Sequence, residues 1–235
     1  MVILDDEVSE DFAAKVHAYV AAFFHGVPVR LYRKGDKIKE KAERGNKVIT
    51  KAVIPVDFMT QHEIPEREYQ GHPQYNAEKC CQALKDYNSR ESFSTIAVTN
   101  EQDLYICDDE KVLEKMPFCF GLADTSSHSS MISLKRHFEG EQEYEEPGVG
   151  LKWTCQTLVH ELCHLFGLMH CTYYECVMNG CQNNAEKYRR QHRILCPVCL
   201  CKLQLNIKFD VRERYARLHQ VSFDLGLHEQ AQTIA

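Results

Sequence analysis

The stretch HELCHLFGLMH, residues 160–170, contains three histidines and one glutamate at spacings that could bind a metal ion. His160 and His164 are four positions apart, so on a helix they project from one face and can share one ion. Glu161 is rotated from His160 by about 100° around that helix, which places it beside the ion rather than on it. A carboxylate in that place suits a general base that acts on a metal-activated water.

His170 can complete this metal site only if the helix ends before it. Six residues of continuous helix would carry His170 about 120° away from the face of His164. Gly167 stands between them, where glycine can adopt the left-handed conformation at low cost and turn the chain. Three histidines leave a fourth zinc position open for water, as in catalytic zinc sites. The alternative, histidines that pack in a core helix, explains neither Gly167 nor His170, so the pattern favours a metal site.

Four cysteines and one methionine follow the histidines in a second pattern. Four thiolates with a Cys-x-x-Cys pair at one end suit a closed, tetrahedral structural zinc site. A methionine soon after the third histidine resembles the Met-turn beneath a metzincin active site. Disulfide bonds are the alternative for the cysteines, although no secretory signal supports it. These residues are Cys171, Cys176, Cys196 and Cys199, with Met178.

The full pattern HELCHLFGLMHC-x4-C-x-M-x17-C-x2-C, over residues 160–199, resembles the signature of the archaemetzincin family of zinc metallopeptidases. FCFGLAD, residues 118–124, is similar to that family's strand near the active-site cleft. The resemblance implies an α+β, metzincin-like zincin fold, in which a twisted mixed sheet with backing and active-site helices lies over a smaller lower half. That lower half would hold the Met-turn and a four-cysteine zinc knuckle. The resemblance also implies hydrolysis of peptide bonds, with one catalytic and one structural zinc per chain.

Carried over position by position, the resemblance gives each motif residue a role. The histidines would hold the catalytic zinc, the adjacent glutamate would act as general base and acid, and the cysteines would hold the structural zinc. Two metal sites would then share the peptide bond between the third histidine and the first cysteine. The residues are His160, His164 and His170 for the catalytic zinc, Glu161 for proton transfer, Met178 for the Met-turn, and Cys171, Cys176, Cys196 and Cys199 for the structural zinc.

Two features depart from the family pattern. Only MVIL, residues 1–4, precedes the first expected helix, where family chains begin with a strand, so that strand is short, missing or trimmed. Asn179 and Gly180 follow the methionine, so the Met-x-Tyr of some other metzincins, whose tyrosine assists the transition state, is absent. Tyr173 or Tyr174 could replace that tyrosine, but tyrosines commonly pack with the hydroxyl at the surface, which favours a structural role.

Alternating helices and strands are expected to position the motif residues. The first helix, over residues 9–26, has Ser9 as its N-cap and Gly26 as its stop. A closing helix with no chemistry of its own is expected over residues 209–223, capped by Asp210. Further expected elements are strands at 27–32, 47–58, 94–99, 118–124 and 130–138, a helix at 77–87, a solvated connection at 33–51, and loops at 60–75 and 139–148.

Composition restricts the class of protein and its compartment. The chain has 235 residues and a net charge of −6, which suits one sizeable domain and does not favour nucleic acid. Its apolar runs are far shorter than the roughly 20 residues of a membrane helix, and its acidic start is not a secretory signal as it stands. Twelve cysteines without such a signal indicate reduced thiols and metal. The basic stretch 186–193 is interpreted as a solvated helix face.

We therefore expect a soluble, intracellular zinc metallopeptidase, cytoplasmic and also nuclear, that acts on peptides as a monomer and binds neither nucleic acid nor membrane. One metzincin-type catalytic domain is expected over residues 1–235, with an upper half at 1–167 that includes the active-site helix and a lower half at 168–235. An edge strand such as 118–124 would align extended peptides by backbone hydrogen bonds. The alternative is a zinc-stabilised peptide-binding module without turnover, against which the retention of Glu161 argues, because it is not a zinc ligand.

Overall fold

The computed structural model describes residues 2–3, 8–41, 48–89, 91–138, 149–180 and 193–234. The chain divides into two compact units, each built from two separate stretches: Met1–Val8 with Leu31–Ser133, and Ser9–Arg30 with Leu134–Ala235. Within the described ranges, no helix is long and apolar enough to cross a membrane. The predicted loop at 139–148 and all but the last residue of the basic stretch 186–193 lie outside the described residues.

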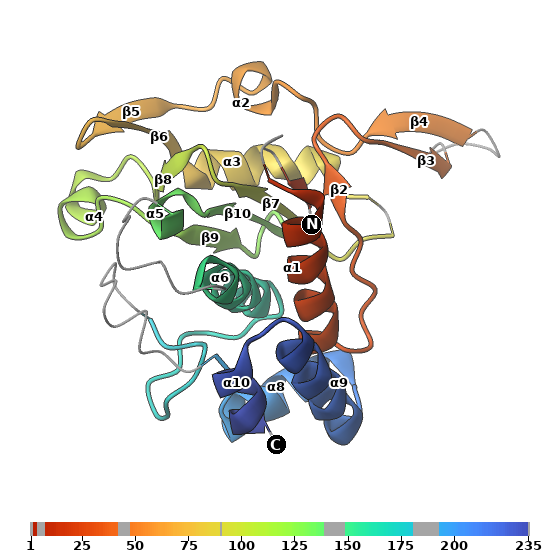
Figure 1. The fold of residues 1–235 in the computed structure, drawn as a ribbon. Coiled ribbons are helices and arrows are strands. Elements are labelled where there is room, and N and C mark those ends of the chain that lie inside the picture. Colours follow the sequence, from red (N-terminus) through yellow and green to blue (C-terminus); the bar gives the residue numbers. More distant parts are fainter. Residues whose placement is uncertain are drawn as a thin grey trace. The chain divides into compact units, whose positions relative to one another are not determined.

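Helices build the second unit, and the first of them begins where the sequence predicts and ends at Phe23, three residues before the predicted stop (Figure 1). Helix α1 (Glu10–Phe23) is capped by Ser9, whose side chain accepts a hydrogen bond from the N–H of Phe12 at 3.1 Å. Gly26, with a φ of 95°, ends the turn that follows. The other described helices of this unit are α5 (Lys135–Phe138), α6 (Val149–Leu165), α8 (Pro197–Ile207), α9 (Val211–Asp224) and α10 (His228–Ile234).

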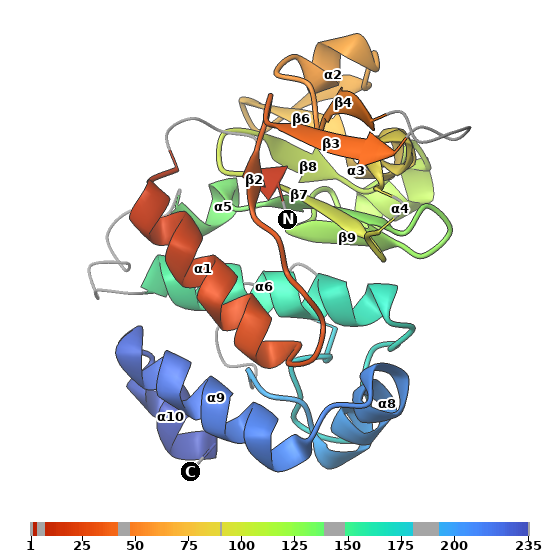
Figure 2. The ribbon, with the colours of Figure 1, turned by 90° about the vertical axis from the view of Figure 1, so that its right-hand side faces the viewer.

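Helix α1 packs against both α6 and α9 (Figure 2). The buried guanidinium of Arg214 on α9 donates from Nε to the carbonyl oxygen of Phe23 at 2.7 Å and lies over the Phe23 ring. Asp210 caps α9 as predicted, accepting from the N–H of Glu213 at 2.8 Å. The helices around α6 are thus fixed by polar caps as well as by apolar packing. The buried stripe of α1 contains Val16, Tyr19, Val20 and Phe23.

A mixed five-stranded sheet forms the main sheet of the first unit, in the order β2-β1-β7-β10-β9. Its pairs are parallel except for β9 with β10. Strand β1 has two residues and pairs with β2 and β7, so the expected first strand is present and short. Strand β9 lies at one edge (Figure 1). The strands are β1 (Val2–Ile3), β2 (Tyr32–Arg33), β7 (Thr95–Thr99), β9 (Gly121–Asp124) and β10 (Ser129–Ser133).

Two smaller sheets also lie in the first unit, and the sequence did not predict them. The expected connection at 33–51 contains a hairpin, and the expected loop at 60–75 contains helix α2 and a second hairpin. Gln70 and Gly71, with φ values of 53° and 80°, make the tight turn of that second hairpin. The elements are β3 (Lys37–Lys41), β4 (Val48–Ala52), α2 (Phe58–Gln61), β5 (Glu66–Tyr69), β6 (His72–Asn76), β8 (Asp103–Tyr105) and α4 (Glu110–Lys115).

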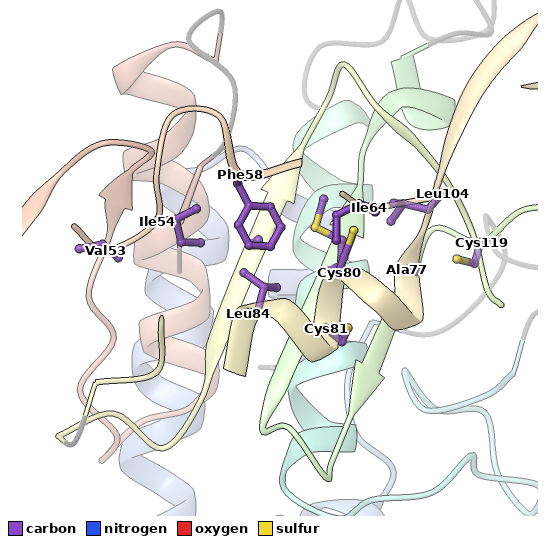
Figure 3. Close-up of a cluster of buried hydrophobic side chains, with 12 residues drawn as sticks. Val53, Ile54, Phe58, Ile64, Ala77, Cys80, Cys81, Leu84, Leu104 and Cys119 are labelled. Atoms are coloured by element: carbon purple, nitrogen blue, oxygen red, sulfur yellow. The ribbon is translucent and has the colours of Figure 1, made fainter. Parts of the chain in front are cut away.

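Helix α3 (Ala77–Leu84), with the 3-10 turn η1 (Lys85–Tyr87), matches the predicted helix at 77–87 and packs on β9 and β10. Asn76 caps it by accepting from the N–H of Lys79 at 3.0 Å. Figure 3 shows the side chains of α3 that enter the core of this unit. The core cluster consists of Val53, Ile54, Phe58, Ile64, Ala77, Cys80, Cys81, Leu84, Ala97, Leu104, Cys119 and Met131.

Four predicted strands were wrong in extent. The one predicted at 118–124 begins only at Gly121. The one predicted at 27–32 is irregular up to residue 31, and Pro28 has no N–H to donate to a ladder. The one at 47–58 ends at Ala52, and the one at 130–138 ends at Ser133 before α5 begins. The unit boundaries also differ from the expected halves, because α6 belongs with residues 168–235 rather than with the sheet. The single catalytic domain stays a prediction.

Candidate metal centres

The three motif histidines lie together in the second unit. His160 and His164 project from α6 one turn apart, and their ring centroids are 4.7 Å apart. The ring of His170, which follows the helix, lies 5.2 Å from that of His160 and 4.8 Å from that of His164. The structure therefore brings the three predicted ligands to one point.

The turn after α6 returns His170 to the helix. Gly167 adopts a φ of 82°, the left-handed conformation predicted for it. Its N–H donates to the carbonyl oxygen of His164 at 2.8 Å, and the N–H of Leu168 donates to that of Cys163 at 3.0 Å. This pair of bonds closes the end of a helix that stops at a glycine.

Backbone carbonyl groups fix the tautomers of the two helical histidines. The Nδ1 atom of His160 lies 2.7 Å from the carbonyl oxygen of Val177, and that of His164 lies 2.7 Å from the carbonyl oxygen of Leu168. Since a carbonyl oxygen can only accept, each Nδ1 carries a proton and donates it. In a neutral imidazole the Nε2 atom is then an acceptor with a free lone pair.

The Nε2 atoms of the three histidines converge. Those of His160 and His164 are 3.1 Å apart, and those of His160 and His170 are 3.3 Å apart. Two nitrogens bound at about 2.05 Å to one tetrahedral zinc would lie roughly 3.3 Å apart. Because the Nε2 atoms of His160 and His164 have no hydrogen to share, their lone pairs repel unless a cation lies between them. The donor set therefore fits a zinc ion.

The protonation of these imidazoles also suits a metal. Burial, and to a smaller extent the neighbouring His164, lowers the pKa of His160 to about 3. Burial likewise lowers the pKa of His164. Both rings are thus neutral near pH 7, which is the state of histidine that binds a metal ion.

Glu161 is the motif residue next to this group without being part of it. It follows His160 on α6 and is 9% exposed. One helical step turns its side chain about 100° away from that of His160, and the three histidines form their group without it. Its place on the helix is the one predicted for a general base.

Four buried cysteines form a second group, Cys171, Cys176, Cys196 and Cys199, with sulfur atoms all within 4.8 Å of one another. The Sγ atoms of Cys171 and Cys196 are 3.9 Å apart. Two thiolates bound at about 2.3 Å to one tetrahedral zinc would lie roughly 3.8 Å apart. No cysteine in the described ranges is in a disulfide bond, so the disulfide alternative has no support there.

The start of helix α8 points backbone N–H groups at two of these sulfur atoms. Cys196 is the N-cap, and its Sγ accepts from the N–H of Cys199 at 3.4 Å. The N–H of Cys196 donates in turn to the Sγ of Cys176 at 3.2 Å. Donors and the positive end of a helix stabilise thiolates, which are the form of cysteine that binds metal.

Burial and hydrogen bonds act in opposite directions on these thiols. Burial raises the pKa of Cys176 to about 11 and raises that of Cys199 as well. Burial would also raise the pKa of Cys171, but hydrogen bonds from the N–H groups of Tyr173 and Tyr174 and from the thiols of Cys196 and Cys199 together hold that pKa below its usual value. A cation is therefore needed to hold all four as thiolates near pH 7.

The short segment Val177–Gly180 contacts both groups, although the sequence singled out only Met178 in it. Besides the bond of Val177 to His160, the carbonyl oxygen of the fully buried Met178 accepts from the N–H of Cys171 at 2.8 Å. A β-carbon added to Gly180 would lie 3.2 Å from Nδ1 of His170. The adjacent Asn-Gly pair, a common turn signal, could have pointed to this segment.

Further tyrosines and cysteines near the motifs lie outside the two groups. Tyr173 is 86% exposed and Tyr174 is 54% exposed, so the packing role favoured for them was wrong. Cys163 lies on α6 but is fully buried as a small core residue, and burial raises its pKa. Cys201 is exposed and does not join the four-cysteine group.

A family model and solved structures both match this chain. The model described as peptidase family M54 matches residues 38–205, well over half of the sequence. The chain belongs to peptidase family M54, the archaemetzincins. Archaemetzincin-2 of Homo sapiens is 27% identical over 237 residues, which cover 90% of this chain and 58% of that protein. The chain thus spans less than two thirds of the length of the curated relative.

Two solved structures share the fold. The archaemetzincin of Methanopyrus kandleri superimposes with a TM-score of 0.58 at 22% identity, over 88% of this chain and 93% of that one. A zinc-dependent peptidase of Methanocorpusculum labreanum gives a TM-score of 0.56 at 20% identity, over 86% and 98% of the two chains. The predicted resemblance to the archaemetzincins is confirmed, and so is the mixed α+β class of the fold.

Proposed function

We propose that this member of peptidase family M54 is a zinc metallopeptidase with its reaction centre at His160, His164 and His170. The observation that carries the proposal is the set of converging Nε2 atoms, 3.1 and 3.3 Å apart, in which two rings are held as acceptors by carbonyl groups. Three protein ligands leave a fourth position free, which is the arrangement of catalytic rather than structural zinc sites.

The residues around that site have different roles in the proposed reaction. When bound, zinc lowers the pKa of water and polarises the carbonyl group of a scissile peptide bond. Glu161 accepts the proton from the attacking water and delivers it to the leaving amine. Its low exposure of 9% shields that proton transfer from bulk solvent. His170, the exposed member of the three histidines, leaves the site open to substrate.

The four cysteines, by this proposal, hold a second, structural zinc, and Met178 forms the Met-turn. The support for the first part is that all four thiols are buried and that, among the residues the structure describes, no fifth candidate ligand joins them. The support for the second is that Met178 is fully buried and its carbonyl oxygen is bonded to the N–H of Cys171. The protein would contain two zinc ions of different function.

Peptides in extended conformation are the proposed substrates. Strand β9 ends the main sheet of the first unit, and an edge strand can align a peptide by backbone hydrogen bonds. We further propose that the protein is an intracellular monomer. Free thiols and a cysteine metal group suit a reducing compartment, and cell fractionation together with light scattering would test both statements.

The function is tested by digestion of a peptide library with the purified protein, read by mass spectrometry. Zinc-loaded protein should cleave peptides, protein treated with a chelator should not, and added zinc should restore cleavage. Binding of peptides without any cleavage by the zinc-loaded protein would favour the alternative, a zinc-stabilised peptide-binding module. Cleavage that survives complete removal of metal would contradict the proposal outright.

A further inference from the structure

We propose that Asn179 is a positioning residue that holds His170 in place by closing the loop from Cys171 to Cys176. The proposal rests on the metal-binding function given above. Neither the histidine pattern nor the cysteine pattern includes Asn179, yet its side chain lies at the junction of the two groups. The loop it closes begins directly after His170.

The amide of Asn179 makes three hydrogen bonds to the backbone of this loop. Its Nδ2 donates to the carbonyl oxygen of Cys171 at 2.7 Å and to that of Tyr174 at 2.8 Å. Its Oδ1 accepts from the N–H of Cys176 at 2.8 Å. Two carbonyl groups require the amino end and one N–H requires the oxygen, so only this orientation of the amide satisfies all three.

The loop has little else to hold it. It contains no helix or strand, and its four residues between the cysteines, 172–175, are all exposed. Exposed residues contribute little apolar burial, which is the usual source of order for an irregular segment. The contacts that order the loop are therefore mainly polar: the N–H groups of Tyr173 and Tyr174 bond to the Cys171 thiol, and the Asn179 amide bonds to the backbone at three points.

His170 depends on this loop through one peptide bond. The N–H of Cys171 belongs to the peptide that joins it to His170, and it donates to the carbonyl oxygen of Met178 at 2.8 Å. Asn179 holds the carbonyl oxygen of the same cysteine, so Cys171 is fixed on both sides by two consecutive residues. A loosened loop would free that peptide and, with it, the approach of the His170 ring.

The two helical histidines do not depend on Asn179 in this way. Both are carried by α6, and their Nδ1 atoms bond to Val177 and Leu168. Replacing Asn179 should therefore weaken one ligand of three rather than abolish the site. Changes to groups just outside a metal site typically cost about 10- to 100-fold in metal affinity.

The test replaces the metal at the three histidines with cobalt(II), while zinc stays on the cysteines. The visible absorption spectrum reports the geometry around cobalt, and titration against a chelator gives its affinity. Asn179→Ala should bind cobalt about 10- to 100-fold more weakly than the wild type and with an altered spectrum. Neither readout depends on turnover of the loaded enzyme.

The matched control is Asn88→Ala in the first unit. The Nδ2 atom of Asn88 also donates to the backbone of a loop, to the carbonyl oxygen of Ser127 at 2.9 Å. Neither Asn88 nor Ser127 belongs to either metal group. Asn88→Ala should leave the cobalt spectrum and the cobalt affinity unchanged, even if it lowers the melting temperature. All variants are measured where circular dichroism matches that of the wild type.

A second variant covers the case in which Asn179→Ala fails to fold. Asn179→Asp keeps the size and the acceptor for Cys176 but loses both donors, so it too should weaken cobalt binding. A wild-type spectrum and affinity in the folded Asn179 variant, or equal losses in Asn88→Ala, would overturn the inference. Wild-type protein that binds no cobalt at the histidines would instead overturn the proposed function, and this inference with it.

Discussion

The Nδ1 atom of His164 donates to the carbonyl oxygen of Leu168 at 2.7 Å, across the turn that ends α6. The turn that orients His164 therefore also brings His170 back towards the helix, because Leu168 lies two residues before His170. The conformation of Gly167, with its φ of 82°, decides where that carbonyl points.

Replacing Gly167 should therefore weaken both stability and metal binding. Gly167→Ala forces a β-carbon into the left-handed region, at a cost of roughly 1–2 kcal/mol, although nothing lies within 4 Å of that carbon. Gly167→Asn should lose less, since asparagine adopts this conformation more readily. Thermal unfolding and metal titration of both variants provide the check. Equal losses in the two would show that backbone conformation is not the cause.

Glu161→Gln should abolish most peptide hydrolysis while the histidine group keeps its metal. The change preserves size and removes the proton acceptor, and loss of general acid–base catalysis typically costs about 10²- to 10⁴-fold in rate. Peptide turnover and metal analysis are measured on the same sample. Glu213→Gln, the same change at the surface of α9, is the control. Loss of metal together with activity would make Glu161 a ligand and refute its role as base.

Metal analysis after gentle purification should find two zinc ions per chain, with different lability. A chelator should first strip the histidine site, one of whose ligands is exposed, and remove activity without unfolding the protein. The four buried thiols should hold their zinc longer, and its loss should lower the melting temperature. A single zinc, or simultaneous loss of both ions with unfolding, would contradict two separate sites.

Damage to the cysteine group should injure catalysis without changing any catalytic ligand. Cys196→Ser is the sharper variant, because serine can still cap α8 at the position where the cysteine sulfur now accepts from Cys199. Cys199→Ser removes a thiolate without altering that cap. Both should lose on the order of a hundredfold in turnover, since small misplacements at a reacting centre are costly. Turnover and histidine-site zinc affinity equal to those of the wild type would contradict a coupling between the two groups.

Gly180→Ala should reduce metal affinity at the histidine site by crowding one ring. The added β-carbon would lie 3.2 Å from Nδ1 of His170 and 3.4 Å from its Cε1, so the ring must shift by a few tenths of an ångström. We expect a loss of about tenfold, the low end for changes just outside a metal site. Gly71→Ala, which meets no atom within 4 Å, reports the effect of backbone strain alone. A larger affinity loss in that control would contradict the steric explanation.

The sequence predicted which histidines and which cysteines lie close together, because their spacing encodes local geometry. Two histidines one helical turn apart, a glycine at the helix end and a Cys-x-x-Cys pair each fix a relation over a few residues. Long-range partners carry no such signal. Nothing in the sequence pairs the carbonyl oxygen of Val177 with His160, or the amide of Asn179 with a loop five residues upstream, because backbone acceptors look alike at every position.

The fold was predicted where apolar residues follow a period, and missed where they do not. Helix α1 shows a clear apolar stripe, whereas β5, with partly exposed and exposed residues in alternation, has too little contrast to indicate a strand. Nothing in the sequence marks Arg214 as buried, because arginine is rarely buried. The buried guanidinium of Arg214 donates to the carbonyl oxygen of Phe23, a contact that exists only in the folded unit.

The bond between Arg214 and Phe23 joins positions that are 191 residues apart. At about 5–20 residues per second, a ribosome needs roughly 10–40 s to make the second after the first. Throughout that interval α1 lacks the α9 partner that covers it, and residues 31–133 of the first unit are made within the same interval. The nascent chain must therefore keep the apolar side of α1 out of aggregates until α9 has been made. Both candidate metal groups belong to the same unit as α1, and their last member, Cys199, is also made before α9.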